Sequence, residues 1–334
     1  MKQFELSRVD EPGQAVAAGA KATTAQQGAD IRFIAGGTTL IDLMKLNVET
    51  PQKLIDVNHL PLNKIDSLPD GGLTIGAMVR NSDLAYHPIV RKEYAVLSEA
   101  ILSGASTQLR NMATTAGNLL QRTRCMYFRD TAMPCNKREP GSGCAGITGV
   151  NRSLAILGTS DHCIATNPSD MNVALAALEA IIHIRGTKGE RSVPIGDFHL
   201  LPGNTPQRET VLEPGDLITH VMLPPPAPGG RSLYLKLRDR ASYEFALASA
   251  AVVVTAMGGK ITRARVALGG VGTKPWRSLE AEAELTDQTA TEAVFRKAAN
   301  AALRDAKPQS QNGFKMELAK RCLVHALKLV TQTA

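Results

Sequence analysis

Residues 33–45 read FIAGGTTLIDLMK and place Gly36 and Gly37 between a strand-like apolar run and an amphipathic segment with helical spacing. Glycine lets a backbone take positive φ values and approach a ligand closely, and the start of the following helix offers unpaired N–H groups to an anion. Thr38 and Thr39 add hydroxyl donors and a helix N-cap. The stretch predicts either an anion-binding turn or a tight strand–helix turn without a ligand, because it lacks the Gly-x-Gly-x-x-Gly dinucleotide spacing.

Two later motifs have the same double interpretation. Residues 113–121, ATTAGNLLQ, present threonine hydroxyls and the Asn118 amide to a pyrophosphate or ribityl chain, or they form a common Gly-Asn turn. Residues 167–178, NPSDMNVALAAL, place Ser169 and Asp170 before a helical pattern. That pair is typical of a helix N-cap, and Asp170 is alternatively an acceptor for ribose or diol hydroxyls.

Four of the five cysteines lie within 125–163, separated by nine, eight and eighteen residues: Cys125, Cys135, Cys144 and Cys163. Disulfide frameworks belong to short secreted chains that lack a core. Structural zinc sites usually use closely spaced cysteine pairs, and no C-x-x-C occurs here. Four separate thiolates around an iron–sulfur cluster need only converge in space. The spacing favours a cluster over the other two sites without excluding them.

The residues around these cysteines are strongly basic. They indicate either a solvated loop face or cations that offset the negative charge of a thiolate-ligated cluster. The residues are Arg122, Arg124, Arg129, Lys137 and Arg138. Cys322 stands apart in a helical pattern and is interpreted as a plain buried thiol.

The order of elements predicts an α+β protein with strands first and helices last in its C-terminal part. We expect one unit over 1–57 with a helix near 12–28, and a second unit over 58–225 with a long helix over 87–105. A third unit over 231–334 follows the Pro-rich stretch 223–230.

Composition excludes several functions. The net charge is +7, but only 4% of residues are aromatic and the basic residues are scattered, so we expect no nucleic-acid binding. No apolar run reaches the roughly 18 to 20 residues that span a membrane, and the N-terminus lacks a signal-peptide pattern. The sequence shows neither a Ser–His–Asp nor an H-E-x-x-H pattern, and its histidines do not recur at a fixed spacing from carboxylates, so we expect no hydrolytic site.

Taken in order, AGGT-x-L, ATTAGNLLQ and PSDM-x-VALAAL resemble the FAD-binding medium subunits of the xanthine dehydrogenase family of molybdenum hydroxylases. The cysteine-bearing insertion, at about 121–165, resembles the subgroup of periplasmic aldehyde oxidoreductases. This resemblance covers nearly the whole chain. It implies a two-part FAD-binding domain over 1–57 and 58–225, then a C-terminal flavoprotein domain of sheet plus helices over 231–334.

The resemblance also implies the site residues. Ala116 departs from the family's usual glycine. The implied metal ligands are the four clustered cysteines, holding a [4Fe-4S] cluster. The implied FAD contacts are Ile34, Ala35, Gly36, Gly37, Thr38, Thr39, Leu40, Ala105, Thr107, Thr114, Gly117, Asn118, Leu119, Ser169, Asp170, Ile218 and Lys236.

The implied function is that of a subunit that transfers electrons and has no catalytic residue of its own. Its partners would be a large molybdenum-cofactor subunit and a small subunit with two [2Fe-2S] clusters, forming a heterotrimer. Electrons would pass through FAD to an external acceptor. Export to the periplasm would follow a signal on a partner subunit, with a cytoplasmic complex as the alternative. Two other functions stay open: a self-contained NAD(P)H-dependent flavin oxidoreductase, and a non-enzymatic metal-binding protein.

Overall fold

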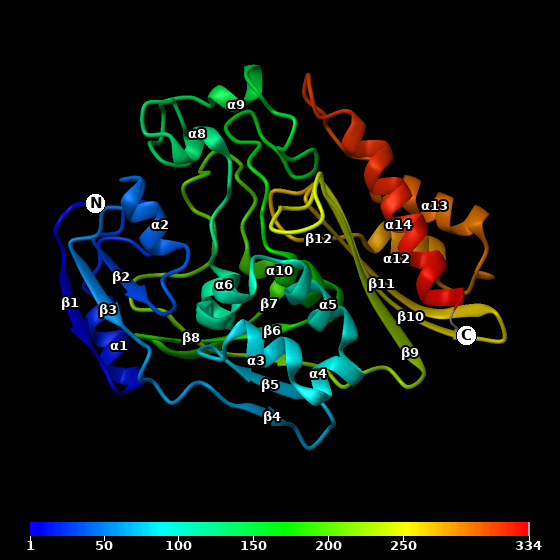
Figure 1. Ribbon diagram of the computed structural model, residues 1–334, viewed down its shortest axis with the longest axis horizontal. Helices are drawn as coiled ribbons and strands as arrows, with labels where there is room; N and C mark the ends of the chain where they lie inside the picture. Colours follow the sequence, from blue (N-terminus) through cyan, green and yellow to red (C-terminus); the bar gives the residue numbers. More distant parts are fainter. Residues whose placement is uncertain (333–334) are drawn as a thin grey trace.

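The structure is a computed structural model that describes residues 1–332. Its N-terminal part is a small parallel sheet flanked by two helices (Figure 1). Its strands run in the order β1-β3-β2. The elements are β1 Glu5–Arg8, α1 Pro12–Gly19, β2 Ile31–Ile34, α2 Leu40–Lys45 and β3 Lys53–Asp56.

The helix expected over 12–28 is shorter than predicted and ends at Gly19. The carboxylate of Asp30 accepts hydrogen bonds from the Thr23 backbone N–H at 2.8 Å and from its hydroxyl at 2.9 Å. Such local side-chain bonds compete with helix formation. A Cβ on Gly19 would also lie 2.6 Å from the ring of Phe33, so the end of α1 packs directly on β2.

The middle part is a five-stranded antiparallel sheet in the order β4-β5-β8-β6-β7. Helices pack on it around the largest hydrophobic core. The strands are β4 Ile65–Ser67, β5 Leu73–Gly76, β6 Ile181–Gly186, β7 Gly189–Pro194 and β8 Leu217–Leu223. The helices are α3 Asn81–Tyr86, α4 Pro88–Glu93, α5 Ala95–Ser103, α6 Thr107–Met112, α7 Thr115–Leu119, α10 Asp170–Ala177 and α11 Ile195–Phe198.

The cysteine-bearing segment forms loops with two short helices, α8 Met126–Arg129 and α9 Ala145–Thr148. In Figure 1 these loops project beside α2. They have a small core of their own, in which Phe128 and Ile164 are buried with three of the cysteines and with Leu43 of α2. The segment therefore packs on the N-terminal part of the fold.

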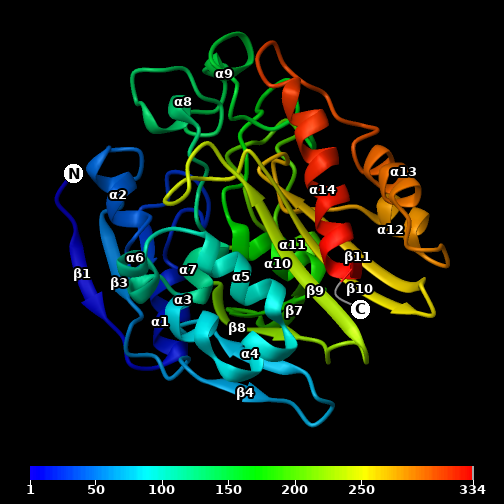
Figure 2. The ribbon, with the colours of Figure 1, turned by 45° about the vertical axis from the view of Figure 1, so that its right-hand side comes forward.

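The C-terminal part is a four-stranded antiparallel sheet in the order β12-β11-β10-β9, with helices on both faces (Figures 1 and 2). Along β10 alternate residues face opposite sides: Ala250 and Val252 join the core under α14, and Ala251 joins the middle core. The elements are β9 Gly230–Leu237, β10 Ala248–Met257, β11 Lys260–Gly269, β12 Trp276–Arg277, α12 Leu279–Leu285, α13 Glu292–Ala302 and α14 Phe314–Gln332.

The predicted α+β class is confirmed, with helices last in the chain. The exact division at 57, 225 and 231 stays a prediction. Among the described residues, no helix combines the length and the apolar character needed to cross a bilayer.

Candidate functional site

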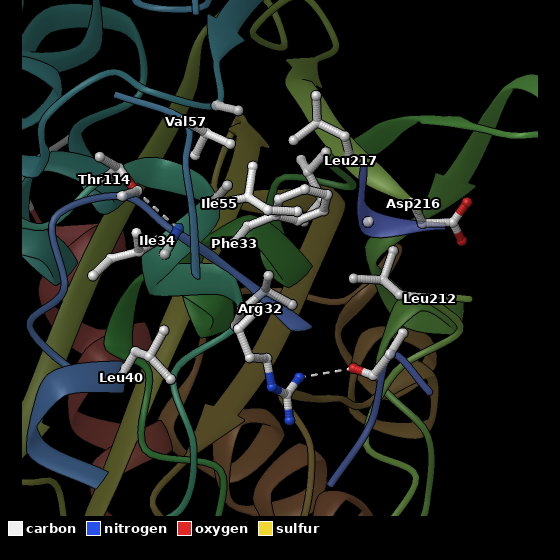
Figure 3. Close-up of a pocket in the computed structure, with 18 of the residues that line it drawn as sticks. Arg32, Phe33, Ile34, Leu40, Ile55, Val57, Thr114, Leu212, Asp216 and Leu217 are labelled. Atoms are coloured by element: carbon white, nitrogen blue, oxygen red, sulfur yellow. Dashed lines mark hydrogen bonds between the residues drawn. The ribbon is translucent and has the colours of Figure 1, made fainter. Parts of the chain in front are cut away.

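The main candidate site is an apolar cavity between the N-terminal sheet and the middle part of the fold (Figure 3). Strand β2 supplies Phe33 and Ile34 to the lining of this cavity, and strand β3 supplies Ile55. The turn between β2 and α2 also lines it. Ala116 from α7 and Leu217 from β8 close the other side. All seven residues of the predicted first turn line this cavity: Ile34, Ala35, Gly36, Gly37, Thr38, Thr39 and Leu40.

The paired glycines are required by backbone geometry. A Cβ on Gly36 would lie 1.9 Å from the carbonyl oxygen of Met112, so the turn after β2 and the end of α6 approach too closely for any side chain at this position. Gly37 has a φ of +72°, a left-handed conformation that glycine adopts without strain. Thr39 occupies the N-cap position of α2, as predicted, but its side chain accepts no capping hydrogen bond from this helix.

The second loop reaches the cavity through α7. Thr114 and Gly117 line it, and the Thr114 hydroxyl accepts the Gly117 backbone N–H at 3.2 Å (Figure 3). Arg80 braces this loop by donating to the Met112 carbonyl oxygen. Ile218 lines the cavity as well. Hydrogen bonds and close packing therefore hold the two glycine-bearing loops side by side.

The other residues implied as FAD contacts do not line this cavity. Ser169 caps α10 by accepting the Asn172 N–H at 3.1 Å, and its hydroxyl lies 2.7 Å from the Asn118 Oδ1. Asp170 is paired with Lys236, 2.8 Å from carboxylate oxygen to Nζ. Three residues remain. Leu119 is buried and lines a cavity that is distinct from the flavin and cysteine cavities, and Ala105 and Thr107 lie around the start of α6. Their contact with FAD stays a prediction.

Several lining residues were missed from the sequence. Arg32 and Phe33 of β2 face the cavity in Figure 3, and Arg32 donates to the Ala25 carbonyl oxygen at 2.9 Å. Asp216 enters from the loop before β8, and Leu217 is the first residue of that strand. Alternation along β2 predicts opposite faces for these two consecutive residues, so it could not have assigned both of them to the cavity. No motif marks the second pair, which reaches the cavity through tertiary packing.

The four clustered cysteines come together around a second, small cavity. Cys125, Cys135 and Cys163 are buried, and Cys144 pairs with Cys135 through an isolated antiparallel bridge. All are free thiols, so the disulfide alternative is not realised. Within residues 1–332 no three His, Cys, Asp or Glu side chains converge tightly enough for a single metal ion. Thiols are soft ligands, and four of them line this one small cavity.

Burial decides the protonation of these thiols. It raises the pKa of Cys125 to about 12, and it raises the pKa of Cys163 against the opposing charge of Lys137. Both are therefore neutral thiols at pH 7 before any metal binds. Because metal ligation requires thiolates, loading this cavity would release protons.

The basic residues near the cysteines are mostly engaged elsewhere. Arg124 and Arg129 pair with Asp42 of α2, and Arg138 donates to the carbonyl oxygens of Tyr127 and Phe128. These basic residues therefore form neither a solvated loop face nor a set of free cations around the cysteines. Lys137 differs, because it is buried and lines the cysteine cavity itself.

Comparisons with known proteins agree with this geometry. Residues 2–226 match the family model described as the FAD binding domain in molybdopterin dehydrogenase. Residues 232–330 match the CO dehydrogenase flavoprotein C-terminal domain. The chain is 52% identical over 328 residues to the aldehyde oxidoreductase FAD-binding subunit PaoB of Escherichia coli, covering 98% of each chain.

More distant relatives share the same architecture. The chain is 27% identical to the glyceraldehyde dehydrogenase medium chain of Sulfolobus acidocaldarius, covering 90% of each. A solved structure of carbon monoxide dehydrogenase from Hydrogenophaga pseudoflava superposes with a TM-score of 0.76 at 27% identity, covering 98% of this chain and 97% of that one. With a cavity built from two glycine-bearing loops, the chain belongs to the FAD-binding medium subunits of the xanthine dehydrogenase and carbon monoxide dehydrogenase family of molybdenum-containing oxidoreductases.

Proposed function

We propose that the chain is the electron-transfer subunit of a heterotrimeric molybdenum-dependent aldehyde oxidoreductase. The aldehyde would be oxidised in a large molybdenum-cofactor subunit, and electrons would arrive through a small subunit carrying two [2Fe-2S] clusters. The observation that carries the proposal is the glycine-walled cavity, in a chain 52% identical to an aldehyde oxidoreductase FAD-binding subunit.

FAD suits this position because it accepts electrons singly and delivers one or two to an external acceptor. The protein's own task is to bind and orient the cofactor. Gly36 lets the turn pack against the Met112 carbonyl, Gly37 supplies the left-handed residue of the turn, and the Thr114 hydroxyl fixes the facing loop. The apolar walls from Phe33, Ile55 and the facing elements exclude water from a bound ring. None of these residues needs to transfer a proton.

We also propose that Cys125, Cys135, Cys144 and Cys163 hold a [4Fe-4S] cluster. Their convergence on one cavity supports it, as does the absence of aspartate or glutamate from that cavity's described lining. The rest of the lining combines apolar and aromatic side chains such as Tyr127 and Phe128 with the polar side chains of Asn136, Lys137 and His162. Four cysteines in such surroundings are the usual ligands of this cluster type.

For location we propose a periplasmic complex, exported with a partner subunit that carries the signal. Fractionation of cells that express all subunits tests it. If this chain fractionates with the cytoplasm, the cytoplasmic alternative replaces the proposal.

The first experiment is an absorption spectrum and an iron assay of the chain purified with the subunits it retains. Bound flavin and about four irons per chain above the partner's [2Fe-2S] content support the proposal. Colourless protein would favour the non-enzymatic metal-binding alternative. Bleaching of the flavin by NADH in the isolated chain would favour the self-contained oxidoreductase.

The ligand assignment is tested with Cys135→Ser. We expect it to lower the iron content by about four atoms while much of the FAD stays bound at saturating concentration, because the cysteine and flavin cavities are separate. Cys322→Ser is the matched control, since Cys322 is also a buried free thiol but lies in α14. Unchanged iron in Cys135→Ser would show that the ligand assignment is wrong.

A further inference from the structure

Five charged side chains form a continuous chain, the charge ladder, from the flavin cavity to the cysteine cavity. Arg32 Nη2 lies 3.1 Å from a carboxylate oxygen of Glu49. The other oxygen of Glu49 pairs with Arg122, which in turn pairs with Glu209. Glu209 Oε1 lies 2.8 Å from Lys137 Nζ. The sequence places these residues in four separate segments, and only the fold connects them.

The ladder is largely buried, although the side chains of Arg32 and Glu209 are partly exposed. The side chain of Glu49 is 1% exposed, those of Lys137 and Arg122 are 10% and 11% exposed, and the most accessible is Glu209 at 25%. The charges of Arg122 and Lys137 overcome burial and lower the pKa of Glu209 to about 2. Because Glu49, Arg122 and Lys137 are largely shielded from water, the loss of an ionic partner leaves them with little solvent to replace it.

Each end of the ladder belongs to a cavity wall. Arg32, Glu49 and Arg122 line the flavin cavity. Lys137 lines the cysteine cavity and is two residues from Cys135. A third cavity of about 120 Å³ shares Arg32 and Arg122 with the first and Lys137 with the second. The two candidate cofactor sites are therefore joined by ion pairs without an intervening apolar layer.

We propose that the charge ladder couples the two cofactor sites, so that a cluster held by the cysteines increases the affinity of the chain for FAD. The proposal rests on the proposed function. A cluster that fixes Cys135 also fixes Lys137, which holds Glu209, and Glu209 holds Arg122 at the flavin cavity wall. By linkage, bound FAD stabilises the cluster by the same free energy. Glu209 is the central positioning residue.

The test is a double-mutant cycle on the FAD dissociation constant, with wild type, Cys135→Ser, Glu209→Gln and the double variant, each purified with the subunits it retains. Iron content is measured in parallel, and FAD binding is followed by flavin fluorescence. We expect Cys135→Ser to weaken FAD binding at least about fivefold in the wild-type background, the low end for coupled sites. In the Glu209→Gln background the same change should weaken it less than about twofold, because the ladder is already interrupted.

Two controls separate the ladder from general destabilisation. Glu179→Gln removes a carboxylate that pairs with three arginines and is 32% exposed, close to the 25% of Glu209, but it lines neither cofactor cavity. It should leave the FAD dissociation constant unchanged. Glu209→Asp keeps the charge and should restore part of the affinity lost in Glu209→Gln.

The outcomes distinguish the two proposals. If wild type carries no cluster iron, the proposed cluster and this inference both fail. If Cys135→Ser loses iron with FAD affinity unchanged, only the coupling is overturned, whether or not Glu209→Gln folds. The coupling is also overturned if the two substitutions act independently in the double variant.

Discussion

At the residue scale, the close approach at Gly36 makes the strongest prediction. Gly36→Ala would place a methyl group 1.9 Å from the Met112 carbonyl oxygen, so the turn after β2 and the end of α6 must separate. We expect a loss of most bound FAD and a lower thermal midpoint. FAD per chain after gel filtration measures the first effect. Gly313→Ala is the control, because a Cβ there meets nothing within 4 Å. If Gly36→Ala retained its FAD, the proposed role of the glycine turn in FAD binding would be contradicted.

The glycine motif predicts a local turn but not which neighbouring side chains face the cavity. The sequence predicts that Gly36 and Gly37 form a turn, because glycine pairs after a strand have few other uses. It does not show that Arg32 and Phe33, next to them, face the same cavity. Their orientation depends on which side of the small sheet is covered, and that is decided by elements far along the chain.

At the scale of the element, the N-cap of α10 carries a prediction. Ser169→Ala removes the capping bond to the Asn172 N–H and the contact with Asn118, so we expect a loss of about 0.5–2 kcal/mol in unfolding free energy. Chemical denaturation measures it. Thr291→Ala removes the equivalent cap of α13, where the Val294 N–H lies 3.4 Å away. If Ser169 also contacts FAD, only its variant should raise the FAD dissociation constant.

Element boundaries were predictable where the pattern was local. The strand-like run before the glycine pair is part of β2, and the helical pattern after it is α2, as the sequence predicted. The long helix expected over 87–105 instead divides at Tyr94, whose side chain is buried and donates to the Pro224 carbonyl oxygen at 2.9 Å. A contact with a residue so distant in sequence has no local signature.

At the scale of the whole molecule, acid stability depends on His199. Its Nε2 lies 3.0 Å from the Leu119 carbonyl oxygen, and burial lowers its pKa from 6.5 to about 4. The unfolded chain therefore binds an extra proton between these pH values, and stability falls on acidification through this window by about 1.4 kcal/mol per pH unit. Glu209 adds a further loss as the pH falls from about 4.5, the usual value for a glutamate, towards its own pKa of about 2.

This pH dependence is measured by thermal unfolding at pH 7 and pH 5. His199→Gln should reduce the drop in midpoint between the two, since an amide can still donate to Leu119 but does not titrate. His59→Gln, at an exposed histidine, should keep the wild-type drop. An identical drop in the His199 variant would assign the acid sensitivity to other groups.

The sequence by itself determined the fold class, the glycine turn, the order of the three flavin motifs and the grouping of four cysteines. Each depends on residues that are neighbours along the chain, where backbone conformation and spacing carry the information. Only the tertiary structure decided that Lys137, Glu209, Arg122, Glu49 and Arg32 form one buried charge ladder. Ion pairs form where packing brings side chains together, and no periodicity or motif records which distant charges will meet.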